Sequence, residues 1–260
     1  MDRHAGATFD EVADLYHAVR PRYPSELFDR IRALPGLAPG SRLLELGMGT
    51  GIATGVLLDA GFDVTGIEPG ASLAAVAREH LGHHPRFRAI VTRFEDWEST
   101  GEPFDIVFSA TAFHWLDRRT RVRRAAACLR EGGYLAIAMY HHVRGGDSAL
   151  FDAVQACYGA HMPGETGDVQ LLPAEDIEPE TRELVEHDLF EALEVFRWTS
   201  EERYNRAGYF DLLSTYSGHR LLTEEAREAL FHCIGEHIDR LPGGVVRKAY
   251  LHELVVARKT

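Results

Sequence analysis

An apolar segment that runs directly into three closely spaced glycines constrains this chain more than any other feature. The segment Leu44-Glu45-Leu46 is followed by Gly47, Gly49 and Gly51. Glycines let a backbone turn sharply and approach a ligand without Cβ clashes. A helix predicted over Ile52–Ala60 would then offer its free N–H groups and positive dipole end to the ligand. The pattern therefore predicts a strand–loop–helix unit suited to binding a carboxylate or a phosphate.

Short β-branched runs alternate with helical stretches through the first half of the chain. The predicted strands are Arg42–Leu46, Asp63–Glu68, Phe87–Thr92, Phe104–Ser109 and Tyr134–Tyr140, and the predicted helices are Ser25–Ala33, Ile52–Ala60, Ser72–Leu81 and Arg118–Arg130. Strands that are nearly continuously apolar, in this alternation with helices, indicate a parallel sheet that is buried on both faces. Such a sheet binds its ligand outside the carboxyl ends of its strands. We therefore expect the functional residues in the loops after residues 46, 67, 92, 109 and 140.

The pattern is looser after residue 141. There we predict helices over Ala149–Ala160, Pro179–Leu189, Ser200–Leu213 and Thr223–Leu241, and strands over Glu194–Thr199 and Lys248–Arg258. Residues 1–142 and 194–260 are expected to form the ligand-binding α/β domain. Residues 143–193, together with 204–222, are expected to form a cap or lid over an acceptor site.

The residue that closes the second predicted strand, Glu68, narrows the ligand class. A carboxylate at this position can accept hydrogen bonds from both hydroxyls of a ribose. Its distance from the glycines suits an adenine dinucleotide or S-adenosylmethionine. A dinucleotide fingerprint reads GxGxxG, but Ile52 stands where the third glycine belongs. An NAD(P)-dependent oxidoreductase therefore remains the weaker alternative.

Several motifs resemble those of a known superfamily. The run Leu44–Gly51 followed by Glu68-Pro69 resembles motif I and the acidic post-motif of class I S-adenosylmethionine-dependent methyltransferases. Three further segments are similar to the trans-aconitate and ubiquinone/menaquinone-type small-molecule methyltransferases: Phe9–Pro24, Ala112–Trp115 and Tyr250–Leu254. The resemblance implies an α/β fold, a Rossmann-like doubly wound sheet of seven strands with the last strand antiparallel, and a helical cap. It also implies methyl transfer from S-adenosylmethionine to a small-molecule acceptor.

The resemblance also implies a set of cofactor-binding residues. These are Tyr16, Arg20, Glu45, Gly47, Gly49, Gly51, Glu68, Pro69, Phe94, Glu95, Ser109 and Ala110. The glycines would line the methionine and ribose portion, Glu68 would bind the ribose hydroxyls, and Phe94-Glu95 would contact the adenine. Tyr16 would flank the sulfonium and Arg20 would pair with the cofactor carboxylate. Alternatively, Glu95 only stabilises a helix start, and Arg20 belongs to a rigid proline-bounded entry to the first helix.

Two neighbouring residues after the fourth predicted strand, His114 and Trp115, are the catalytic candidates. An aromatic face holds a sulfonium without the strong ground-state attraction of a carboxylate. A neutral imidazole can accept a proton from an acceptor that must lose one, although a histidine beside a tryptophan is equally often a packing residue. His141 and His142 are weaker candidates. His219, with Tyr216 and Arg220, is suited to a polar or anionic acceptor, but a surface-loop role is favoured for these histidines.

Composition excludes several other partners. The net charge of −12 disfavours nucleic acid. No apolar run approaches the ~20 residues of a membrane helix, and the polar start of the chain is unlike a signal peptide. We therefore expect a cytoplasmic protein without a membrane partner, of open oligomeric state. A non-catalytic S-adenosylmethionine-binding protein stays possible on the same motifs.

The cysteines and histidines predict neither disulfides nor a metal centre. Cys128, Cys157 and Cys233 are far apart and odd in number, so we expect no disulfide framework and no CxxC metal site. The adjacent histidine pairs His83-His84 and His141-His142 point apart on a regular backbone and cannot chelate as an i, i+4 pair does.

Overall fold

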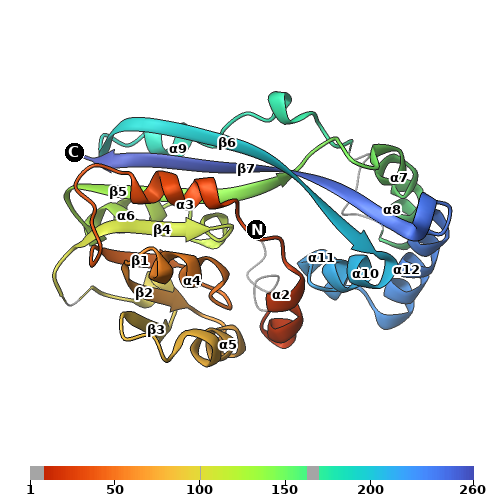
Figure 1. Ribbon diagram of the computed structural model, residues 1–260, viewed down its shortest axis with the longest axis horizontal. Coiled ribbons are helices and arrows are strands. Elements are labelled where there is room, and N and C mark those ends of the chain that lie inside the picture. The colour runs from red at the N-terminus through yellow and green to blue at the C-terminus, as the bar shows by residue number, and fades with distance from the viewer. Residues whose placement is uncertain (1–8, 100, 163–169) are drawn as a thin grey trace. The chain divides into compact units, whose positions relative to one another are not determined.

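The computed structural model describes residues 9–99, 101–162 and 170–260 (Figure 1). The chain divides into two compact units, which are described separately below. Unit 1 comprises Met1–Pro21, His141–Glu178 and Thr199–Leu251, and unit 2 comprises Arg22–Tyr140, Pro179–Trp198 and His252–Thr260.

A seven-stranded sheet with the strand order β3-β2-β1-β4-β5-β7-β6 organises the fold. Its strands are β1 (Arg42–Leu46), β2 (Asp63–Glu68), β3 (Phe87–Val91), β4 (Phe104–Ala110), β5 (Leu129–His142), β6 (Phe190–Asn205) and β7 (Val245–Lys259). Strands β1 to β5 pair in parallel, and the last strands are antiparallel. The predicted α/β class, the seven strands and the antiparallel last strand are confirmed.

Unit 2 buries both faces of its part of the sheet. Its helices are α3 (Ser25–Arg32), α4 (Ile52–Asp59), α5 (Ala71–Leu81), α6 (Arg121–Cys128) and α9 (Arg182–Val185), with short 3₁₀ turns η2 (Phe94–Asp96) and η3 (Phe113–Trp115). Leu43 packs in one core cluster with residues of α3 and α4, whereas the next residue, Leu44, packs in a second cluster with residues of α6. Successive strand residues point to opposite faces, so two covered faces require the continuous apolar runs seen in the sequence.

Unit 1 has its own apolar core. Its elements besides strand segments are η1 (Asp10–Val12), α2 (Ala13–Val19), α7 (Ser148–Ala153), α8 (Gln155–His161), η4 (Ala174–Asp176), α10 (Arg206–Ser214), α11 (Ser217–Arg220), α12 (Glu224–Ile238) and η5 (Pro242–Gly244). Leu150 of α7, Leu212 of α10 and Ile234 of α12 are buried together in this core. Among the residues that the structure describes, no helix is long and apolar enough to cross a membrane.

Several of the predicted helices need correction. The predicted helix Pro179–Leu189 covers only Arg182–Val185, and the predicted helix Ala149–Ala160 is divided into α7 and α8. The predicted helix Arg118–Arg130 is shorter, because residues before Arg121 form a turn in which the Thr120 N–H donates to the Asp117 carbonyl. The predicted helix Ser200–Leu213 is wrong in its first part, where β6 continues to Asn205. Sheet pairing outweighs the helix propensity of a Glu- and Arg-containing segment. The helix begins only at Arg206, where the Asn205 side chain caps it by accepting from the Gly208 N–H at 2.8 Å.

The two compact units and the predicted domains have different bounds. Residues 1–21 and 223–251, expected in the cofactor-binding domain, belong to unit 1. Residues 179–193, expected in the cap, belong to unit 2. A cap function for residues 143–193 and 204–222 stays a prediction.

Candidate functional site

The strand order places a topological switch point in unit 2. From β1 the chain continues to β2 and β3 on one side, and β4 and β5 then add on the other side of β1. The neighbouring strands β1 and β4 pair in parallel, with Glu45 opposite Phe108. A ligand crevice is expected outside the carboxyl ends of such a strand pair. The glycine loop follows β1 at this edge, and His114 follows β4.

Two glycines give the loop after β1 its shape. Gly47 has a φ of +69°, and a Cβ atom there would lie 2.5 Å from the Cβ of Ala112. This glycine therefore lets the loop after β1 contact the loop after β4. Gly49 has a φ of +55°, but a Cβ atom on it would meet nothing within 4 Å. The backbone at Gly49 thus borders open space, as a ligand cradle requires. Gly51 stands at the N-cap of α4.

The carboxylate of Glu68 is bound to this loop. Glu68 is buried, and its Oε2 accepts a hydrogen bond from the Gly49 N–H at 2.9 Å. Its Oε1 accepts from the Gly70 N–H at 2.8 Å. The two backbone donors fix the orientation of the carboxylate beside the glycine loop, and its predicted contact with ribose hydroxyls stays a prediction. Pro69 is exposed and leads into α5.

Glu45 connects β1 to α4. It is 1% exposed, and burial raises its pKa to about 8, with the nearby charge of Glu68 adding to the effect and a hydrogen bond from Thr54 opposing it. The Thr54 hydroxyl donates to Glu45 Oε2 at 2.7 Å. Near pH 7 this carboxyl is therefore mostly protonated, and its part in cofactor binding stays a prediction.

The end of β4 is fixed by two hydroxyl contacts. The buried Ser109 hydroxyl donates to the Leu46 carbonyl at 2.9 Å, which joins β4 to β1 directly before the glycine loop. After Ala110, Thr111 adopts a φ of +53°, which is uncommon for a residue with a side chain. Its Oγ1 lies 2.5 Å from the Tyr23 hydroxyl. No local sequence pattern predicts this contact, because Thr111 and Tyr23 are 88 positions apart.

Phe94 and Glu95 form the start of η2 after β3. Phe94 is 3% exposed, and the Arg124 guanidinium carbon lies 5.3 Å from its ring centroid. Glu95 Oε1 accepts from the Asp117 N–H at 2.9 Å. Both residues thus position neighbouring loops, and their predicted contacts with adenine stay a prediction.

The catalytic candidates His114 and Trp115 lie in η3, with ring centroids 5.0 Å apart. Burial lowers the pKa of His114; the charge of Glu180 raises it and that of Arg121 lowers it. The imidazole is therefore neutral near pH 7 and can accept a proton. His114 borders a cavity of about 250 Å³ in unit 2, whose other lining residues are Phe113, Arg118, Arg121, Ile137, Met139, Glu180, Arg182, Glu183, Leu184, Glu253 and Val255.

A buried ion pair borders the same cavity and was missed in the sequence. Glu253 is fully buried, and its Oε2 accepts from Arg197 Nε at 2.8 Å and pairs with Nη2 at 2.7 Å. Glu253 Oε1 has no hydrogen-bond partner among the described residues. Glu253 stands in the closing motif Tyr250–Leu254, which the sequence analysis used only for the family resemblance.

Tyr16 and Arg20, the two predicted cofactor contacts near the N-terminus, belong to unit 1. The Arg20 guanidinium carbon lies 4.6 Å from the ring centroid of Tyr16 and 4.6 Å from that of Tyr216. Arg20 Nε donates to Thr215 Oγ1 at 2.9 Å. Within unit 1 both residues therefore pack against the region of α10 and α11. Their roles toward the cofactor stay predictions.

His219 is not a surface-loop residue, which corrects the favoured prediction. It is 7% exposed, and its Nε2 lies 3.1 Å from the Tyr158 hydroxyl.

Burial lowers the pKa of His142 well below its usual value, and the charges of Lys248, Arg20 and His141 lower it further. Arg220 forms an ion pair with Glu11.

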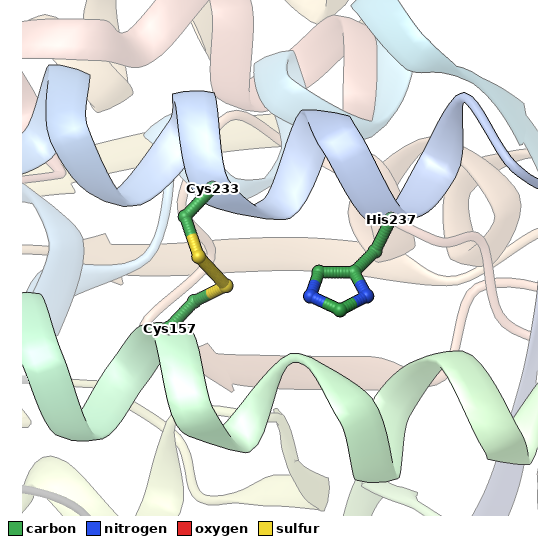
Figure 2. A group of neighbouring side chains, drawn as sticks. All are labelled: Cys157, Cys233 and His237. Atoms are coloured by element: carbon green, nitrogen blue, oxygen red, sulfur yellow. A yellow bond between two sulfur atoms is a disulfide. The ribbon is translucent and has the colours of Figure 1, made fainter.

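The expectation of unpaired cysteines is also wrong for one pair. Cys157 of α8 and Cys233 of α12 form a disulfide, with Cα atoms 5.8 Å apart (Figure 2). The two cysteines are 76 residues apart, so no local sequence pattern predicts the bond. Only the packing of α8 against α12 brings them together. The His237 imidazole lies close by, with its nearest ligand atom within 4.8 Å of both sulfurs. Cys128 is a free, buried thiol whose pKa burial raises to about 11. The absence of a metal stays a prediction.

Comparison with known proteins identifies the class of the central segment. Residues 44–137 match a family model described as a methyltransferase domain. A Mycobacterium tuberculosis protein described as the uncharacterized methyltransferase Rv3342 is 33% identical over 135 residues, which make up 52% of this chain and 53% of that protein. The chain thus matches about half the length of this relative. The matched family segment contains the glycine loop, Glu68 and His114.

Solved structures share the fold over most of the chain. The YjhP protein of E. coli is similar with a TM-score of 0.56 and 16% identity, covering 97% of this chain and 99% of that one. Phosphoethanolamine N-methyltransferase 2 of Haemonchus contortus, solved with phosphomonomethylethanolamine and S-adenosylhomocysteine, has a TM-score of 0.54 and 17% identity, covering 96% of this chain and 57% of that one. At these identities the similarity shows the fold alone.

Proposed function

We propose that this chain, which carries a class I S-adenosylmethionine-dependent methyltransferase domain, transfers the methyl group of that cofactor to a small-molecule acceptor. The cofactor assignment agrees with the Haemonchus contortus relative, which was solved with the demethylated cofactor. The match to a methyltransferase family over residues 44–137 favours this activity over nicotinamide-dependent oxidation.

One observation carries the proposal: the buried Glu68 carboxylate is held against the glycine loop at the switch point of the sheet. The hydrogen bond from Gly49 keeps this acceptor beside a stretch of backbone that borders open space. A nucleoside fits such a site, because the carboxylate accepts from its ribose hydroxyls while the glycines allow close approach. Gly47, Gly49 and Gly51 would line the methionine and ribose portion, and Phe94-Glu95 would lie at the adenine.

In methyl transfer by direct displacement the protein need not form a covalent bond with either reactant. When bound, the cofactor supplies an electrophilic methyl group on a sulfonium. The protein aligns the acceptor with the methyl–sulfur axis and excludes water. The neutral imidazole of His114 takes a proton from an acceptor that must lose one. The indole of Trp115 offers an aromatic face to positive charge.

The test is a calorimetric titration of the full chain with S-adenosylmethionine, S-adenosylhomocysteine, NAD and NADP. We expect the first two to bind and the nicotinamide cofactors not to bind. Heat with NAD or NADP alone would overturn the cofactor assignment.

A methyl-transfer assay with a panel of small metabolites then tests catalysis. Labelled methyl groups should appear on one or a few of the acceptors. Cofactor binding without transfer to any small molecule, but with transfer to protein or nucleic acid, would overturn the acceptor class.

A further inference from the structure

A buried lysine of unit 1 has no acidic partner among the described residues. Lys248 on β7 is 6% exposed, and its Nζ lies 4.7 Å from the ring centroid of Phe151 and 5.8 Å from that of Tyr250. Among the described residues, no carboxylate or carbonyl oxygen binds this ammonium group. Burial lowers the pKa of Lys248 to about 8, so the side chain is still mostly charged at pH 7. Burying an ammonium group without a counter-charge is costly, and a purely structural lysine would be expected to have one.

A second donor without an acceptor lies in the field of this lysine. Burial raises the pKa of Tyr158 to about 12 and lowers that of His219 to about 4, with the charge of Lys248 contributing to the latter. Both side chains are therefore neutral at pH 7. The Tyr158 hydroxyl lies within hydrogen-bond distance of His219 Nε2 at 3.1 Å. In the tautomer in which Tyr158 donates, the neutral ring carries its proton on Nδ1. His219 Nδ1 is buried and has no hydrogen-bond partner among the described residues.

The described charges that lower the pKa of His142 are positive. The pKa of His142 on β5 is lowered by burial and then by the positive charges of Lys248, Arg20 and His141. None of the described acidic residues is among the causes of the lowered pKa values of Lys248 and His219. This is notable in a chain with 40 Asp and Glu residues.

Two acidic residues of unit 1 are paired with arginines. Asp147 forms an ion pair with Arg247 at 2.7 Å. Glu11 pairs with Arg220. The region around Lys248 thus combines an ammonium group without an acidic partner among the described residues, a buried imidazole nitrogen without a hydrogen-bond partner among them, a positive field and aromatic walls. That combination fits a ligand that brings its own negative charge and acceptor oxygens.

We propose that unit 1 binds a small organic anion, a carboxylate or a phosphate monoester, whose oxygens accept hydrogen bonds from Lys248 Nζ and His219 Nδ1. Phe151 and Tyr250 flank the ammonium group and pack against the apolar part of the ligand. The Cys157–Cys233 disulfide joins α8, which carries Tyr158, to α12 (Figure 2). The inference concerns unit 1 alone and does not depend on the proposed methyl transfer.

The chain offers an unusually clean test, because Lys248 and Lys259 are its only lysines. Isotope-labelled lysine gives two side-chain signals in an NMR titration of the full chain. Acetate and succinate serve as carboxylate probes, inorganic phosphate and glycerol 3-phosphate as phosphate probes, and sodium chloride of equal ionic strength as the blank. The two pairs of probes distinguish the carboxylate from the phosphate source.

Binding of an anion should raise the pKa of Lys248 and leave that of Lys259 unchanged, since an opposite charge favours the ammonium form. By calorimetry the Lys248→Met variant should bind the effective probe at least about tenfold more weakly, and Lys259→Met should match the wild type. The proposal is overturned if no probe moves the Lys248 signal more than sodium chloride does. The wild-type titration decides this even if Lys248→Met does not fold. Titration of the same sample with S-adenosylhomocysteine reports separately on the methyltransferase domain.

Discussion

The carboxylate of Glu68 accepts a hydrogen bond from the backbone N–H of Gly49 at 2.9 Å, so the last residue of β2 orients the loop that follows β1. The two residues are 19 positions apart in sequence. Their contact joins a fixed negative charge to the stretch of loop that borders open space. Replacing Glu68 tests the role of the negative charge in cofactor binding. Replacing Gly49 tests the role of the backbone shape.

Replacing Glu68 with alanine should weaken S-adenosylmethionine binding by about 100-fold, because hydrogen bonds to a charged acceptor contribute roughly 1.5–3 kcal/mol each. Calorimetry measures this change. Asp63→Ala is the matched control, since Asp63 is an exposed carboxylate at the other end of the same strand. Wild-type affinity in the Glu68→Ala variant would place the ribose elsewhere.

Three glycine-to-alanine variants should differ in melting temperature and in cofactor affinity, and the differences test whether the cofactor approaches Gly49. All three positions have positive φ, which costs an alanine about 1–2 kcal/mol. Gly47→Ala adds a clash with Ala112 and should lower the melting temperature most. In Gly49→Ala the added methyl group meets no protein atom, so the stability of the fold should fall only by the cost of the positive φ. The affinity for the cofactor should nevertheless be lost. Gly40→Ala, which also meets nothing within 4 Å but precedes β1, is the control that retains affinity. Equal affinity in the Gly49 and Gly40 variants would show that no ligand approaches Gly49.

His114→Gln should lower turnover by about 10²–10⁴-fold with an acceptor that must lose a proton, and leave cofactor binding unchanged. Burial lowers the pKa of His114, so its neutral form persists to lower pH than that of a free imidazole. The acid limb of the kcat/KM profile should therefore fall below pH 6.5 and disappear in the variant. Unchanged single-turnover rates with the true acceptor would make His114 a packing residue.

Reduction of the Cys157–Cys233 disulfide should destabilise unit 1 by about 2–4 kcal/mol, because the bond restricts the unfolded chain. Thermal unfolding with and without a dithiol reductant measures the effect. The Cys157→Ala/Cys233→Ala double variant is the control, since reductant should not change its melting temperature. Cys128 should stay unreactive toward thiol reagents in the folded protein, because burial raises its pKa to about 11. A mass of the untreated protein equal to that of the reduced protein would show that the disulfide does not form.

Local patterns were sufficient for the central sheet. The bounds predicted for β1 and β2, Arg42–Leu46 and Asp63–Glu68, are those of the structure. Both strands are mostly buried, and a glycine or a proline follows the last residue of each. Such signals fail for β6, whose segment Ser200–Asn205 has a helix-like composition but pairs in the sheet.

By itself the sequence determined the α/β class, the glycine loop and the acid that closes β2, because each depends on residues within one strand–loop–helix unit. Only the tertiary structure decided which distant side chains meet. Tyr23 contacts Thr111, Cys157 bonds to Cys233, and Arg197 neutralises Glu253. It also left Lys248 without an acidic partner among the described residues. These relationships arise from the packing of elements far apart in the chain, and no local periodicity encodes such contacts.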